Sequence, residues 1–357
     1  LERGWVVLSR DTPDSISSGQ YRNYRLLRTT DGGSTWEPVL LPCAGPDSSS
    51  TDYWERIVIR LEGQRDAWLV CGGNPLRQGL PENMRKLFGW LYHSRDDGQT
   101  WEKVIQVSLW ALYHNRPHGI TTSDPPSIAF VGEQLGWVGT GGFGLLKTTD
   151  GGYTWQDVAM PWFGNLPFWD VHVFSPLHGL VVWSNSFGAL LAETQDGGNN
   201  WQQIFPPPLP RQMQFFDAYN GVAVGSFPLQ YNQFFHTSDG GFTWRPGKPV
   251  WRCSPSETGA GDCVAAVGMY AAIQAFYFVT PQTGYVLAQG APDALYVTHD
   301  GGETWSLLPK LPPPDTYYSV AFIDEQTGFL TQSSGGVLVT RDGGQTFNAV
   351  NQGGLSF

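Results

Sequence analysis

The chain has 357 residues, of which 41% are hydrophobic and 15% charged, and its formal net charge is −11 at pH 7. An acidic chain repels the phosphate backbone, which argues against a nucleic-acid partner. No stretch approaches the roughly 18 consecutive apolar residues of a membrane-spanning helix. Glycine (44) and proline (26) are abundant and aromatic residues reach 14%, which is typical of many short strands joined by tight turns.

The first recognisable element is the apolar segment 4–7, which predicts a strand, and an octet with the sequence TTDGGSTW follows at residues 29–36. Close copies of this octet recur along the whole chain, at residues 94–101, 148–155, 194–201, 237–244, 298–305 and 340–347. Their aspartates are Asp31, Asp96, Asp150, Asp196, Asp239, Asp300 and Asp342. Neighbouring aspartates are 42 to 65 residues apart, so each repeat is long enough for about four short strands.

Each octet has the chemistry of a tight turn between two strands. The aspartate accepts hydrogen bonds from nearby backbone N–H groups, and the glycines supply positive φ angles. The hydroxyl groups on both sides can lock the same turn, and the final aromatic residue begins the next strand. The octets therefore predict structural turns, with no catalytic or metal-binding role for the seven aspartates.

A second pattern precedes the octets and predicts two inner strands in each repeat. It consists of an apolar segment that ends near a phenylalanine, followed by a glycine and another apolar segment, at 128–130 and 136–138, 171–174 and 179–181, 215–216 and 221–223, 276–278 and 284–286, and 321–322 and 328–330. The second repeat has a weaker copy at 57–61 and 67–70, and the first repeat lacks its first strand. We predict that the C-terminal segment 354–357 supplies this missing strand.

These patterns predict an all-β protein in which residues 1–357 form a single seven-bladed β-propeller of four-stranded antiparallel blades. The octets resemble the Asp-box, or bacterial neuraminidase repeat, S/T-x-D-x-G-x-T-W. In proteins of that kind the box joins the third and fourth strands of a propeller blade. The chain is most similar to the photosystem II stability/assembly factor family, which consists of a lone seven-bladed propeller without catalytic function.

Other Asp-box families match less well. Sialidases have six blades and an early Arg-Ile-Pro sequence, which does not occur here. Xyloglucanase-type glycosidases pair two propellers around a cleft, and this chain is long enough for one. The sortilin family has ten blades and a cysteine-rich module. The resemblance therefore implies a binding or assembly scaffold with a protein or peptide partner.

The loops opposite the boxes are the predicted binding face, because long loops on a rigid scaffold usually carry function. They span residues 9–20, 41–53, 72–88, 106–125, 159–168 and 246–270. Aromatic residues outside the repeat pattern are the candidate ligand-binding residues, namely Trp110, Tyr113, His114, Trp162, Phe163, Trp169 and Trp251. Exposed rings of this kind bury against a peptide or stack on a sugar, and they also pack loops onto blades.

The alternative function is a glycoside hydrolase, a lyase or a glycan-binding propeller that acts on a polysaccharide. A pair of carboxylates is the usual machinery of glycoside hydrolysis. The candidates lie near the inner ends of first strands: Asp52, Asp124, Asp170 and Asp315. The seven histidines and four cysteines form no metal-binding spacing, so no metal and no cofactor are expected.

The four cysteines predict two disulfides. Cys43 and Cys71 fall on the same predicted loop face, and Cys253 and Cys263 lie within one loop. Disulfides are typical of an extracytoplasmic compartment, and four free thiols in a cytosolic protein are the alternative. The chain begins with Leu1, so we expect that a signal or lipoprotein segment has been removed or that the boundary is arbitrary. We expect a secreted, periplasmic or lipid-anchored monomer.

Overall fold

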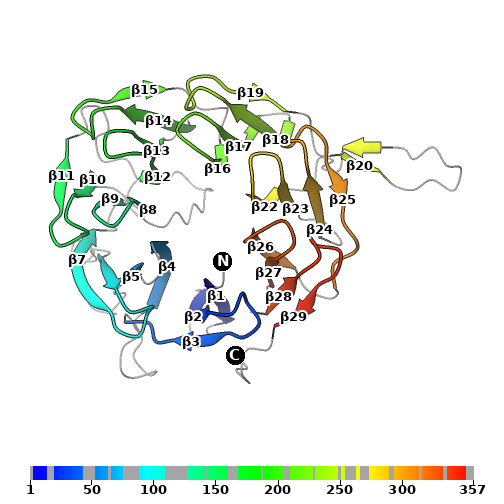
Figure 1. The fold of residues 1–357 in the computed structure, drawn as a ribbon, viewed down its shortest axis with the longest axis horizontal. Coiled ribbons are helices and arrows are strands. Elements are labelled where there is room, and N and C mark those ends of the chain that lie inside the picture. The colour runs from blue at the N-terminus through cyan, green and yellow to red at the C-terminus, as the bar shows by residue number, and fades with distance from the viewer. Residues whose placement is uncertain are drawn as a thin grey trace, which may run out of the picture. The chain divides into compact units, whose positions relative to one another are not determined.

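A computed structural model describes residues 3–13, 20–42, 53–62, 66–74, 88–108, 127–140, 144–159, 168–185, 188–204, 210–227, 230–247, 251–253, 263–265, 273–288, 293–312, 316–332 and 336–350. These residues form strands and turns, and none of them lies in a helix. The strands form seven sheets that each contain one Asp-box, and one further two-stranded ribbon (Figure 1). The fold class is therefore that of a seven-bladed β-propeller, as the sequence predicts.

The blades follow one another along the chain, and consecutive strands pair within each blade. Blade one contains β1 (Gly4–Pro13), β2 (Gln20–Thr29) and β3 (Glu37–Val39). Blade two contains β4 (Tyr53–Glu62), β5 (Asp66–Asn74), β6 (Phe88–Ser94) and β7 (Glu102–Ser108). Blade three contains β8 (Ser127–Val131), β9 (Leu135–Thr140), β10 (Gly144–Thr148) and β11 (Gln156–Val158). Blade four contains β12 (Phe168–Val173), β13 (Gly179–Asn185), β14 (Gly188–Thr194) and β15 (Gln202–Ile204).

The last three blades repeat this order, and an insertion separates blades five and six. Blade five contains β16 (Pro210–Phe215), β17 (Gly221–Phe227), β18 (Gln230–Thr237) and β19 (Arg245–Pro246). The inserted ribbon consists of β20 (Trp251–Cys253) and β21 (Cys263–Ala265). Blade six contains β22 (Ile273–Phe278), β23 (Gly284–Ala288), β24 (Ala294–Thr298) and β25 (Ser306–Leu307). Blade seven contains β26 (Tyr317–Phe322), β27 (Gly328–Gln332), β28 (Val337–Thr340) and β29 (Asn348–Ala349).

The burial of each strand follows its place in the blade. All five residues of β23 are buried, as its uninterrupted apolar sequence GYVLA requires of a strand covered on both faces. Both residues of β25, the outermost strand of the same blade, are exposed. In blades three to seven the fourth strand has only two or three residues, which limits the length of unpaired edge that these blades present to solvent, whereas β7 of blade two has seven.

Two parts of the predicted architecture, the completion of blade one and the loop before blade six, are not confirmed by the structure. Blade one has three strands within the described residues, and the C-terminal segment 354–357 that we expect to complete it lies outside them. The stretch 246–270 is not wholly a loop, since it contains the ribbon of β20 and β21. Closure by the C-terminus therefore stays a prediction.

Contacts divide the chain into two compact units. The first comprises Leu1–Gly4, Arg28–Glu37 and Phe205–Phe357, and the second comprises Trp5–Leu27 and Pro38–Ile204. In the first unit, one buried cluster surrounds Tyr285 and Phe322, whose rings stack 3.5 Å apart, and another surrounds Phe234 and Phe276. In the second unit, buried clusters surround Trp137 and Trp68.

Within each unit, aromatic rings of one blade pack against the box of the next. A Cβ atom on Gly98 would lie 2.1 Å from Cη2 of Trp5, and one on Gly152 would lie 2.0 Å from Cη2 of Trp68. Both glycines also have positive φ angles, of 78° and 86°. The second glycine of a box is therefore required for two reasons: its backbone has a positive φ, and a side chain would overlap the neighbouring ring.

Two glutamine side chains join blades five and six. Gln214 donates from Nε2 to the carbonyl oxygen of Phe278 (2.8 Å), and its Oε1 accepts from the N–H of the same residue (2.9 Å). Gln212 contacts the backbone of Phe276 in the same way, at 3.0 and 3.3 Å. These amides pair with β22 much as the backbone of a neighbouring strand would.

Candidate functional site

Most of the predicted binding residues lie outside the described residues. This holds for Trp110, Tyr113, His114, Trp162 and Phe163, and for the acids Asp52, Asp124 and Asp315. Trp169 lies in β12 and Trp251 in β20, but only their backbone is described. Their proposed contact with a ligand stays a prediction.

The Asp-boxes are hydrogen-bonded turns between the third and fourth strands, as predicted. In the third box, Oδ1 of Asp150 accepts from the Thr148 hydroxyl (2.7 Å) and from the N–H of Thr154 (2.9 Å). Its Oδ2 accepts from the Thr154 hydroxyl (2.6 Å), and the N–H of Gly152 donates to Oγ1 of Thr148 (2.8 Å). These bonds, led by the Thr154 hydroxyl, lower the pKa of Asp150 from 3.8 to about 2.

Variants of the box keep the same bonds with different groups. Asn200 stands where other boxes have threonine, and its Nδ2 donates to Oδ2 of Asp196 at 2.6 Å. Asp97 stands in place of the first glycine and still has a positive φ of 65°. Since the carboxylates are committed to these turns, the boxes have a structural role.

The boxes lie at the same edge of each blade as the turn between its first two strands. The first glycine of a box donates from its N–H to a carbonyl oxygen in that turn, as Gly151 does to Gln134 and Gly197 to Leu177, both at 2.8 Å. We call this the box edge. In an antiparallel blade, the other connections leave from the opposite edge.

Asp170, one of the predicted acids, takes part in a contact between blades three and four. Its Oδ1 accepts from the Ser127 hydroxyl (2.8 Å), which itself accepts from the N–H of Val171 (3.0 Å). Nε2 of His172 lies 3.1 Å from its Oδ2. The carboxylate thus lies between serine and histidine, an order in which the histidine cannot act as the base that activates the serine hydroxyl.

A hollow of about 70 Å³ lies at the box edge between blades two and three. The ring of His93 stacks on Trp68, with centroids 3.9 Å apart, and its Nε2 lies 3.3 Å from Oδ1 of Asp66. Burial, reinforced by the positive charge of Arg95, lowers the pKa of His93. The guanidinium of Arg95 lies over the Tyr153 ring, 4.5 Å from its centroid.

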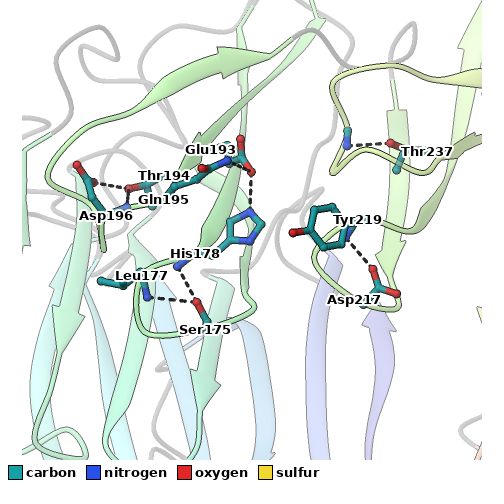
Figure 2. A network of polar contacts seen from close by, with 11 residues as sticks. Ser175, Leu177, His178, Glu193, Thr194, Gln195, Asp196, Asp217, Tyr219 and Thr237 are labelled. Carbon is teal, nitrogen blue, oxygen red and sulfur yellow. Dashed lines mark hydrogen bonds and ion pairs between the residues drawn. The ribbon is translucent and has the colours of Figure 1, made fainter.

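Blade four has a similar pair with the acid and the histidine exchanged. Figure 2 shows the His178 ring directed at Glu193, with 2.6 Å between Nε2 and Oε1. Glu193 precedes its box as His93 precedes its own. Asp66 and His178 are equivalent as well, because each precedes the residue that pairs with the first residue of the box, Ala67 with Ser94 and Gly179 with Thr194. The N–H of His178 also donates to Oγ of Ser175 in the turn below (3.0 Å). Sequence reasoning missed both pairs, although the residue before each octet could have been compared across the repeats.

Among the described residues, no group of three or more histidine, cysteine or acidic side chains could hold a metal ion. None of them belongs to a helix with the length and apolar character needed to cross a membrane.

Comparisons with known proteins agree with this architecture. The model of the BNR/Asp-box repeat matches residues 92–103 and 296–307. No curated protein sequence matches the chain significantly. The chain is therefore a seven-bladed propeller that contains Asp-box repeats.

Three solved structures share the fold at low sequence identity. YCF48 bound to D1 peptide is 18% identical with a TM-score of 0.56, over 95% of this chain and 96% of that one. The GH74 enzyme of Niastella koreensis is 16% identical with a TM-score of 0.56, over 94% of this chain and 52% of the enzyme. A PL25 ulvan lyase bound to a saccharide is 12% identical with a TM-score of 0.51, over 97% of this chain and 91% of that one. At these identities the likeness extends to the fold alone.

Proposed function

We propose that this protein is a non-catalytic binding scaffold that holds a protein or peptide partner at the blade edges opposite the Asp-boxes. The observation that carries the proposal is the division between the two edges of each blade. At the box edge the carboxylates are committed to turns, as the bonds of Asp150 illustrate. The opposite edge bears the long connections between strands, where binding residues are usually found.

The comparison with YCF48 supports the same proposal. That protein was solved with a bound peptide, and its chain is matched over nearly its whole length. The GH74 enzyme is matched over about half of its chain. We propose an extracytoplasmic location and a monomeric state for the scaffold. Its net charge of −11 favours the approach of a basic partner segment.

Site-specific cross-linking would test the proposal. Peptides that bind the full chain are first selected from a random library displayed on phage. A photo-cross-linking residue is then placed at Trp110 or Trp162, and in matched controls at the exposed box-edge residues Tyr153 and Phe242. We expect cross-links to the selected peptides from the first two positions only. Equal or stronger cross-linking from the control positions would contradict the proposal.

The second candidate function is cleavage of a polysaccharide, which the likeness to the GH74 enzyme and the ulvan lyase favours. Incubation with xyloglucan and with ulvan, followed by assay of reducing ends and unsaturated products, would detect it. If activity is found, Asp170→Asn should abolish it, whereas Ser127→Ala, which disturbs the same contact between blades, should leave most of it. Equal loss in both variants would indicate a structural role for Asp170.

A further inference from the structure

The first Asp-box, in blade one, directly contacts blade seven at the end of the chain. Nη2 of Arg341 donates to Oγ of Ser34 (2.8 Å) and to the carbonyl oxygen of Gly32 (3.4 Å), across 307 and 309 residues of sequence. The ring of Phe329 stands edge-on to Trp36, with centroids 5.6 Å apart and an interplanar angle of 88°. All of these residues belong to the first compact unit.

The same ring also fits against the glycine of this box. A Cβ atom on Gly33 would lie 2.5 Å from two ring carbons of Phe329. An apolar ring and a charge-assisted hydrogen bond thus hold the first box from two sides. Gly33 also has a positive φ of 82°, so its turn requires a glycine, and the missing side chain leaves the space that the ring occupies.

The same arrangement recurs between blades two and three. Arg95, the second residue of its box, lies over Tyr153, the sixth residue of the next box. Arg341 and Ser34 hold these same second and sixth positions. Trp68 lies against Gly152 as Phe329 lies against Gly33. The same pair of contacts, an arginine and an aromatic ring against the next box, therefore occurs at two junctions, and we call it the bracket. Blades two and three are in addition consecutive in the chain, whereas blades seven and one are not.

We propose that the bracket between the first box and blade seven is a latch that holds the two ends of the fold together at the box edge. Its contacts are those of Arg341 and Phe329 with residues 32–36. Where two blades adjoin in the chain, the connection keeps them close even when such a contact opens. Ser34 and Arg341 are 307 residues apart, so opening of their contact frees a loop of about 300 residues.

Hydrogen exchange followed by mass spectrometry tests the latch in the full chain. Arg341→Gln removes the charge-assisted bonds, and Arg95→Gln is the matched control at the other junction. We expect Arg341→Gln to speed exchange about two- to tenfold, both in residues 29–37 and in β27 and β28. Arg95→Gln should change exchange only in its own box and the next. Equal, local effects of the two variants would overturn the proposal.

A second variant should strengthen the latch. Ser34→Asp places a carboxylate where the hydroxyl now accepts from Arg341, and a charged pair makes the stronger bond. We expect slower hydrogen exchange in residues 29–37 and in β27 and β28. This slowing should disappear when Arg341→Gln is added. A gain of equal size without Arg341 would show that the two residues are not coupled, and would refute the latch.

Discussion

Replacement of Gly98 by alanine should destabilise the protein much more than the same change at Gly32. Both glycines have positive φ angles, of 78° and 68°, so both variants carry the left-handed strain of about 1–2 kcal/mol that a Cβ brings. Alanine also lowers the conformational entropy of the unfolded chain relative to glycine, which offsets about 0.4–1 kcal/mol of this cost in each variant. They differ in their surroundings, because a Cβ at Gly32 has no atom within 4 Å, whereas one at Gly98 lies 2.1 Å from Trp5.

The overlap with Trp5 adds the cost of overpacking, about 1–3 kcal/mol. We therefore expect Gly32→Ala to lower the free energy of unfolding by about 1 kcal/mol, and Gly98→Ala by about 2–4 kcal/mol. Asp97, adjacent to Gly98, already has a side chain at a φ of 65°, which shows that the first glycine position tolerates one. Equilibrium unfolding in urea would measure both values.

A double-mutant cycle isolates the ring as the cause. Trp5→Leu removes the atoms that a Cβ at Gly98 would meet, so Gly98→Ala should then cost no more than Gly32→Ala does. If Gly98→Ala costs the same with either residue at position 5, or if the two alanine variants are equally stable, the packing argument is wrong.

Acid should weaken the boxes. The pKa of Asp150 is about 2 in the folded protein and 3.8 for an ordinary aspartate. Its contribution to the free energy of unfolding is therefore complete above about pH 4 and is lost as the pH falls towards 2. Melting temperatures measured from pH 5 to pH 2 should drop more for the native chain than for Asp150→Asn. The backbones of Cys253 and Cys263 are paired in the ribbon, and directly paired antiparallel residues have Cα atoms close enough for a disulfide. The unreduced protein should therefore be lighter than the reduced one by two hydrogens per bridge, and unchanged mass on reduction would refute the bridge. Gln214→Ala leaves the N–H and carbonyl of Phe278 without these partners and should cost about 1–3 kcal/mol in urea unfolding. Gln214→Glu keeps the acceptor but places a carboxylate oxygen against the carbonyl oxygen of Phe278, so it should cost at least as much, and a clearly smaller loss would argue against the amide pairing.

The blade architecture could be predicted from the sequence because its signals are local. The octet contains all the atoms of its own turn, from the Thr148 hydroxyl to the Thr154 N–H. Each apolar segment likewise reports the burial of its own strand, as the sequence of β23 does. Such patterns need no knowledge of distant partners.

The remaining features depend on partners that are far apart in the sequence. Arg341 gives no local sign that it will contact Ser34, and Gln214 lies 64 residues from Phe278. The sequence predicts a loop where the structure has the ribbon of β20 and β21, because each of these strands has only three residues. The candidate site was predicted on loops, where the sequence has no periodicity that could fix a geometry.

The paired amides of Gln212 and Gln214 have a consequence for how the protein unfolds. In a repeat protein, stability is approximately a sum of the stability of each repeat and of the coupling between neighbours. Four hydrogen bonds between β16 and β22 raise that coupling at the junction of blades five and six. Blades five and six should then lose their structure as one cooperative step. Coupling that differs from one junction to the next would give a chain of related repeats a preferred order of unfolding.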